Sequence, residues 1–101
     1  MDDITVEELK NKMNKNDSFI LIDVRENYEH TEFNIGGTLA SLNASLAYKI
    51  DELKGHEQDE IIVYCKSGNR SGIAKNMFIQ AGFKNVRNLI GGMIAWRNRI
   101  G

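Results

Sequence analysis

Cys65, the only cysteine of the chain, lies between two segments that predict a strand and a helix. Residues 61–64 form a continuous apolar run, which is typical of a buried strand. After the cysteine, apolar residues recur at helical spacing from Ile73 to Ala81. We therefore expect the thiol at a helix N-terminus, where backbone N–H groups and the helix dipole favour an anion. A thiol in such a place ionises readily, and the thiolate is its reactive form.

The loop that follows the thiol has the composition of an anion-binding site. It consists of Lys66, Ser67, Gly68, Asn69 and Arg70. A loop of this length points several backbone N–H groups inward. Gly68 permits a backbone angle that bulkier residues resist, and Asn69 tolerates left-handed geometry. The serine adds a hydroxyl and the two basic residues add positive charge, so the loop would hold a thiolate or a persulfide.

The spacing between Cys65 and Arg70 separates two kinds of chemistry. A cysteine phosphatase of the tyrosine-phosphatase kind has five residues between cysteine and arginine, whereas this chain has four. Tyr64 also stands where such phosphatases carry a histidine. The spacing therefore favours a smaller electrophile, such as the outer sulfur of thiosulfate or of a persulfide. A small phosphatase or arsenate reductase stays open as an alternative.

The rest of the chain predicts the elements that position this loop. Helices are expected over residues 6–13, 26–33, 42–53, 73–81 and 93–99, and strands over residues 19–22, 38–39, 61–64 and 86–89. The first helix begins with a capping box from Thr5 to Glu8. Strands that alternate with helices predict an α/β fold with a central parallel sheet. Because sites form at the carboxyl ends of such strands, Asp23 and Arg25 are expected across one crevice from Cys65.

Length, charge and cysteine content limit the class of protein. With 101 residues, the chain is expected to form one domain over residues 1–101. A net charge of −1 indicates neither nucleic acid nor a membrane as partner, and no apolar run approaches the roughly 20 residues of a membrane span. A single cysteine cannot form an internal disulfide, which indicates a reducing compartment such as the cytoplasm. His30 and His56 lack the grouping of metal ligands, so we expect solvated side chains and no metal site.

Three motifs in order give the chain a family resemblance. They are LIDVRENYE (residues 21–29), CKSGNRS (residues 65–71) and NLIGGMIAW (residues 88–96). With them the chain resembles a single-domain rhodanese, a sulfurtransferase, over nearly its whole length. The resemblance implies a three-layer α/β/α fold with a central, mostly parallel sheet of five strands. It also implies that Cys65 is the nucleophile that carries a persulfide, with residues 66–70 as the binding loop.

The expected reaction proceeds in two halves through Cys65. Its thiolate attacks the outer sulfur of a donor such as thiosulfate and becomes a persulfide. Cyanide, a small thiol or a protein cysteine then takes the terminal sulfur, and the covalent persulfide makes a separate cofactor unnecessary. A second interpretation is a sulfur-relay or binding module, which would pass the persulfide to a protein partner without turnover on small acceptors.

Residues around the loop are interpreted as structural. Asp23, Arg25 and Ser71 are expected to support the site, since an aspartate at a strand end braces a neighbouring loop. Arg25 is expected to pair with Glu29 on the surface. In the last helix, Ile94, Trp96 and Ile100 are expected to pack in the core, after a turn made by Gly91 and Gly92.

One stretch departs from the family pattern. Rhodaneses often carry a Gly-His-Ile-Pro-Gly-Ala-like segment followed by another proline, whereas residues 33–42 contain neither histidine nor proline. The loop of the nucleophile is intact. The resemblance therefore defines the chemistry more closely than it defines the acceptor.

Overall fold

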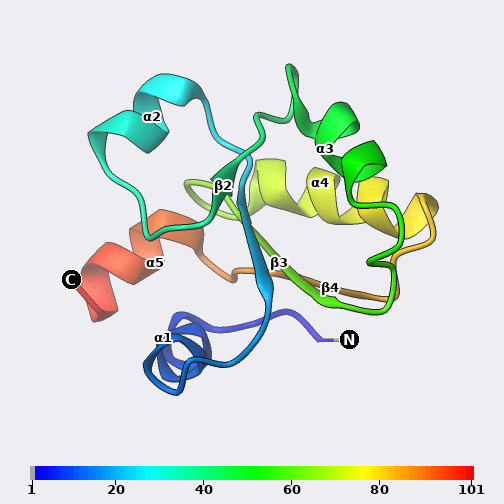
Figure 1. Cartoon of the computed structure of the whole chain (residues 1–101). Coiled ribbons are helices and arrows are strands. Elements are labelled where there is room, and N and C mark those ends of the chain that lie inside the picture. The colour runs from blue at the N-terminus through cyan, green and yellow to red at the C-terminus, as the bar shows by residue number, and fades with distance from the viewer. Residues whose placement is uncertain (1) are drawn as a thin grey trace.

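Four parallel strands form the centre of the structure, a computed structural model that describes residues 2–101 (Figure 1). In sheet order they are β2 (Thr38–Leu39), β1 (Ile20–Asp23), β3 (Glu60–Tyr64) and β4 (Asn85–Asn88). The helices are α1 (Val6–Asn14), α2 (Asn27–Glu32), α3 (Leu46–Glu52), α4 (Asn69–Gln80) and α5 (Gly92–Arg99). Figure 1 shows α1 and α5 on one face of the sheet and α3 and α4 on the other. The expected three-layer α/β/α fold with a parallel sheet is confirmed.

The sheet differs from the expected five strands at one edge. Within residues 2–101 it has four strands, and the fifth position is reduced to a single parallel bridge between Ile4 and Leu89. The Ile4 amide donates to the Asn88 carbonyl (3.0 Å), and the Ile90 amide donates to the Ile4 carbonyl (2.9 Å). Thr5 then caps α1 at once, with its hydroxyl accepting from the Glu8 amide (3.1 Å). The chain enters the helix too soon for a strand to form.

Apolar side chains on both faces of β1 and β3 hold the layers together. Ile22, Ile61 and Val63 pack in one cluster with residues of α3 and α4. Leu21 and Ile62, on the opposite face, pack in a second cluster with residues of α1 and α5. Side chains alternate between the two faces of a strand, so these continuous apolar runs are buried on both sides. Each fully buried side chain of this size stabilises the fold by about 1.5–3 kcal/mol.

Two predicted helices differ in detail from the structure. The helix expected from residue 42 begins at Leu46, because the Leu42 amide donates to the Val24 carbonyl (3.1 Å) and ties this residue to the end of β1. In α4 the buried residues are Ser71, Ala74 and Phe78, while Ile73 is 55% exposed. Ile73, the first of the apolar residues at helical spacing, therefore faces solvent. Across residues 2–101, none of the helices is long and apolar enough to cross a membrane.

Candidate active site

Cys65 follows β3 directly and lies inside the turn that leads into α4. Its side chain is buried, with 1% of the residue exposed. The sulfur accepts a hydrogen bond from the Gly68 amide (3.1 Å) and lies 3.3 Å from the hydroxyl of Ser71. Gly68 has a φ of 108°, in the left-handed region that glycine adopts without strain. This turn points the Gly68 amide back at the sulfur.

The environment of Cys65 favours the thiolate by hydrogen bonds. Burial acts to raise the pKa of the thiol, because it removes water from the charged form. Hydrogen bonding by the Ser71 hydroxyl, and by the amides of Ser71, Gly68 and Ser67, outweighs burial and lowers the pKa below its ordinary value. The thiolate is thus stabilised where the sequence predicts an anion-binding turn.

The other loop residues are placed differently from one another. The side chains of Lys66, Ser67 and Asn69 are exposed, and Asn69 is the first residue of α4. Arg70 turns to α2, where its guanidinium binds both carboxylate oxygens of Glu29 (2.7 and 3.0 Å). Hydrogen bonding to Arg70 lowers the pKa of Glu29 to about 2. The expected pair of Arg25 with Glu29 is wrong, since Glu29 binds Arg70 instead.

Asp23, at the end of β1, organises a second buried polar group. Its carboxylate accepts from the backbone amide of Arg25 (3.0 Å) and from the guanidinium (2.8 and 2.9 Å). His30 Nδ1 donates to the same carboxylate at 2.8 Å. Burial acts to raise the pKa of Asp23, but the hydrogen bonds from Arg25 and His30 lower it overall. His30, expected in solvent, is half-buried because it binds the fully buried carboxylate of Asp23. His56 is exposed as expected.

The glycines before α5 bring this helix against the Cys65 loop. The carbonyl of Cys65 accepts from the Met93 amide, and that of Lys66 accepts from the Ile94 amide, both at 3.0 Å. A Cβ atom on Gly92 would lie 2.5 Å from the Cys65 carbonyl oxygen, so no larger residue fits. The glycine pair therefore does more than make a turn. It lets the N-terminus of α5 bind the loop backbone.

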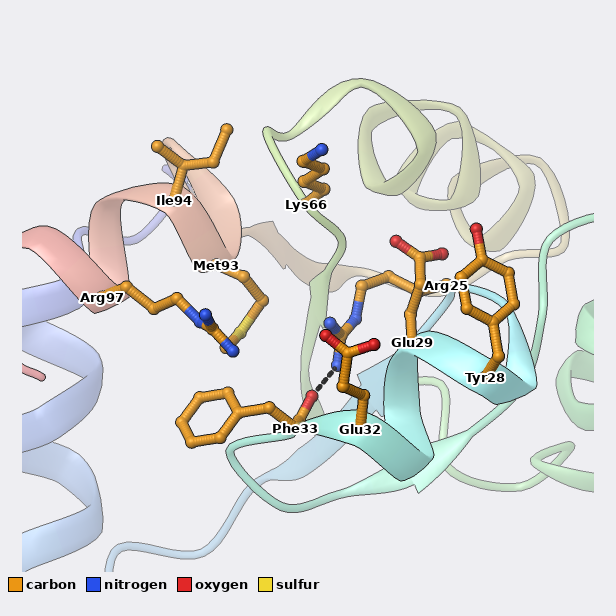
Figure 2. Close-up of a pocket in the computed structure, with 9 residues that line it drawn as sticks. All are labelled: Arg25, Tyr28, Glu29, Glu32, Phe33, Lys66, Met93, Ile94 and Arg97. Carbon is orange, nitrogen blue, oxygen red and sulfur yellow. Dashed lines mark hydrogen bonds between the residues drawn. The ribbon is translucent and has the colours of Figure 1, made fainter.

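A cavity of about 300 Å³ opens beside the loop, between α2 and α5 (Figure 2). Lys66, the residue after Cys65, lies at its edge, and Tyr28 and Glu32 line the α2 side. From α5, Arg97 lies 4.6 Å from the centre of the Phe33 ring. Ile94 also lines the cavity and is 47% exposed, so its expected place in the core is wrong. Trp96, on the other side of α5, is buried as expected.

Hydrogen bonds hold residues 33–42, the segment that lacks the prolines of the family pattern, against the sheet. The carbonyl of Phe33 accepts from the Arg25 guanidinium (2.7 Å), and the hydroxyl of Tyr64 donates to the Gly36 carbonyl (2.9 Å). A Cβ atom on Gly37 would lie 2.5 Å from the Leu21 carbonyl oxygen, so the backbone passes close to β1. Phe33 thereby takes a fixed place in the wall of the cavity.

Asn88 is a further residue of the site that sequence reasoning missed. It ends β4, and its side-chain amide donates to the Gly68 carbonyl (3.0 Å). Its side-chain oxygen lies 2.5 Å from the Ser71 hydroxyl. The available signal was its position, because Asn88 is a polar residue at the end of a buried parallel strand, as Asp23 is.

Comparison with known proteins agrees with this fold. The model of the rhodanese-like domain family matches residues 5–99. A solved structure from Staphylococcus saprophyticus, SSP1007, superimposes with a TM-score of 0.79 at 30% identity, covering 92% of this chain and 90% of the other. The chain belongs to the rhodanese-like domain family.

Two curated relatives carry names from sulfur chemistry. "Putative sulfur carrier protein YrkF" of Bacillus subtilis is 33% identical over 97 residues, which are 96% of this chain and 51% of that protein. "Putative thiosulfate sulfurtransferase, mitochondrial" of Schizosaccharomyces pombe is 34% identical over 98 residues, covering 82% of this chain and 66% of the relative. The chain therefore spans about half of the first relative and just under two thirds of the second.

Proposed function

We propose that this protein is a sulfurtransferase of the rhodanese type, which carries sulfane sulfur as a persulfide on Cys65. The observation that carries the proposal is the environment of the sulfur. The Gly68 amide and the Ser71 hydroxyl converge on it at 3.1 and 3.3 Å, and the pKa of the thiol is lowered. Membership of the rhodanese-like family and the names of the two relatives support the same chemistry.

The first half-reaction loads the cysteine. The Cys65 thiolate attacks the outer sulfur of thiosulfate and forms a new S–S bond. The S–S bond of thiosulfate breaks, and its electron pair leaves with sulfite. The hydrogen bonds of the loop then stabilise the negative charge of the persulfide, and they need little rearrangement because the turn already holds them in place.

The second half-reaction returns the enzyme to its starting state. Cyanide or a thiolate attacks the terminal sulfur of the persulfide, and the electron pair of the broken bond returns to Cys65 as a thiolate. No oxidant, reductant, metal or organic cofactor takes part in either half. A reducing compartment such as the cytoplasm would keep the single thiol free for this cycle.

The cavity beside the loop is the proposed route for donor and acceptor. Lys66 and Arg97 contribute positive charge at its edge that exceeds the negative charge of Glu32, which favours an anionic donor such as thiosulfate. Phe33 and Met93 contribute apolar surface, which suits the carbon skeleton of a thiol or the side chains around a protein cysteine. Both classes of acceptor therefore fit the lining.

A sulfur-relay module is the second candidate, and the name of the Bacillus subtilis relative, a putative sulfur carrier protein, favours it. In this case Cys65 would load with sulfur but would transfer it to a protein partner only.

Thiocyanate formation from thiosulfate and cyanide tests the proposal. The native chain should turn over, and Cys65→Ser should lose all turnover. Ser67→Ala is the matched control, because the Ser67 side chain is exposed, and it should retain nearly full activity. Turnover in Cys65→Ser would contradict the assignment of the nucleophile. Hydrolysis of an aryl phosphate that is lost with Cys65→Ser would replace the proposal by a phosphatase.

A further inference from the structure

Asn88 touches both groups that direct a hydrogen bond at the sulfur. It lies opposite Val63 in the register of β4 and β3, two residues before Cys65. Its side-chain nitrogen donates to the carbonyl of Gly68, whose amide donates to the sulfur. Its side-chain oxygen contacts the hydroxyl of Ser71, which is the second partner of the sulfur. The Asn88 side chain thus contacts both groups that hydrogen-bond the sulfur, the Gly68 peptide and the Ser71 hydroxyl.

Only one orientation of the Asn88 amide satisfies these contacts. The Gly68 carbonyl can only accept, so the nitrogen of Asn88 faces it and the oxygen faces Ser71. The hydroxyl of Ser71 carries a single proton and cannot donate to Asn88 and to the sulfur at the same time. With a protonated thiol, the S–H group donates to the hydroxyl and the hydroxyl donates to Asn88. With a thiolate, the proton of the hydroxyl turns to the sulfur.

We propose that Asn88 is a positioning residue for Cys65. Its side-chain nitrogen holds the Gly68 peptide so that the Gly68 amide points at an anionic sulfur, while its side-chain oxygen competes with the sulfur for the single proton of Ser71. This inference deepens the proposed sulfur transfer, because the same anion is the nucleophile and the product of each cycle. Asn88 does not touch the sulfur and acts through its two neighbours. Ser71 is fully buried, so its hydroxyl depends on side chains such as Asn88 for its partners.

The charged groups around the sulfur lie on the loop and on elements packed against it. On the loop itself, Lys66 is exposed and Arg70 is bound to Glu29 of α2. The backbone amide of Asn88 donates to the carboxylate of Asp3, which also binds Lys75 of α4. On the α5 side, Arg97 lines the cavity. A substitution of the Asn88 side chain changes none of these charged groups, so their electrostatic effect on the sulfur is the same in every variant.

The rate of alkylation by iodoacetamide as a function of pH tests the role of Asn88. Since Cys65 is the only cysteine, every alkylation event reports on this sulfur. The comparison is made in chains that carry Ser71→Ala, where the competing hydroxyl is absent. There Asn88→Ala removes the support of the Gly68 amide, so the profile should move to higher pH and the rate at neutral pH should fall about 3- to 10-fold. Asn85→Ala is the matched control, because Asn85 begins the same strand and donates to the distant Gln58 carbonyl. In the same background its profile should match that of Ser71→Ala alone.

Asn88→Asp provides a second variant of nearly the same size. A carboxylate cannot donate to the Gly68 carbonyl, accepts strongly from the Ser71 hydroxyl, and adds negative charge near the sulfur. Its alkylation rate should therefore fall further than that of Asn88→Ala, by more than about 10-fold. Asn85→Asp adds the same charge at the other end of the strand and should have little effect. This pair decides the question even where Asn88→Ala does not fold.

A double-mutant cycle with Ser71→Ala separates positioning from a merely structural role. Because Asn88 also competes for the Ser71 proton, Asn88→Ala should lower the alkylation rate more in the Ser71→Ala background than in the native chain, where the freed hydroxyl partly compensates. Profiles of Asn88→Ala and Asn85→Ala that coincide in the Ser71→Ala background, or an Asn88 effect that Ser71→Ala leaves unchanged, would overturn the proposal. Alkylation requires no sulfur donor, so the result stands apart from the proposed function. A chain that never accepts sulfur from thiosulfate would refute sulfur transfer and leave the role of Asn88 in the pH profile intact.

Discussion

Asp23 and Cys65 lie at the carboxyl ends of neighbouring parallel strands, but the negative charges of their side chains are stabilised by different kinds of donor. Asp23 pairs in register with Tyr64, which directly precedes Cys65. Asp23 and Cys65 are both buried, with 0% and 1% of the residue exposed, respectively. The carboxylate of Asp23 is bound by the cationic Arg25 and by His30. Within residues 2–101, the hydrogen bonds to the sulfur of Cys65 come from neutral donors, the Ser71 hydroxyl and the amides of the loop.

The difference separates a structural anion from one that we propose to react. A guanidinium that binds a carboxylate at two points cancels its charge and fixes its position. Neutral amides and a hydroxyl stabilise a thiolate and leave its electron pair available for attack. Arg70, the basic residue of the loop that could have paired with the sulfur, is held by Glu29. The loop therefore stabilises an anion without a direct ion pair to neutralise it.

Removing the charge of Asp23 should have the largest effect on stability. Asp23→Asn leaves the buried guanidinium of Arg25 without its carboxylate, which costs about 3–5 kcal/mol in the free energy of unfolding. Urea denaturation measures this loss. Asp59→Asn is the matched control, since Asp59 is exposed and pairs with His56 on the surface, and it should change stability by less than about 0.5 kcal/mol. Equal effects of the two substitutions would refute the structural role of Asp23.

Removing the hydroxyl of Ser71 should weaken the reactive anion. Ser71→Ala deletes one of the hydrogen bonds that lower the pKa of Cys65, so burial is less well opposed and the pKa rises. The rate of alkylation at neutral pH should fall about 3- to 10-fold. Ser67→Ala tests the same residue type on the exposed part of the loop and should leave the rate unchanged. An unchanged rate in Ser71→Ala would show that the hydroxyl does not stabilise the thiolate.

The sequence predicts the local structure around Cys65 better than it predicts contacts between distant parts of the chain. The apolar run before Cys65 and the glycine three residues after it specify a strand and a turn through local contacts, and both are present. The pair of Glu29 and Arg70 joins residues 41 positions apart, which no local pattern reveals. Asn88 likewise meets the loop only because β4 lies beside β3. Ile73 belongs to the apolar pattern of α4, but the buried face of this helix runs through Ser71, Ala74 and Phe78 and leaves Ile73 exposed.

The pair of Glu29 and Arg70 should stabilise the fold in a pH-dependent way. The pKa of Glu29 falls from 4.5 to about 2 in the folded chain, so the stabilisation is fully present above pH 4.5 and is lost as the pH falls towards 2. Glu29→Gln should cost about 1–2 kcal/mol at neutral pH and almost nothing near pH 2, because the pair is partly exposed. Chemical denaturation at several pH values measures this difference.

Glu32→Gln is the control for this pH dependence. Glu32 lies on the same helix, is exposed, and has no ion pair within residues 2–101. Its substitution should change stability little at any pH. A difference between native chain and Glu29→Gln that stays constant from pH 7 to the acid limit of the measurement would contradict the assignment.

The smallest effect is expected at the edge of the cavity. Arg97→Ala removes one exposed positive charge from the proposed route of thiosulfate, so KM should rise about 2- to 3-fold, with less effect at high salt. Arg99→Ala removes the same charge from the same helix outside the cavity, where it pairs with Glu7. If both variants change KM equally, the cavity is not the route of the donor.

The mass of the intact protein after incubation with thiosulfate tests the central claim most directly. A buried sulfur that receives neutral donors alone should gain one sulfur atom, located on Cys65 by fragmentation. Cyanide should remove this atom and restore the original mass, and Cys65→Ser should gain nothing. An unmodified native chain, or an added sulfur that persists in Cys65→Ser, would contradict the account.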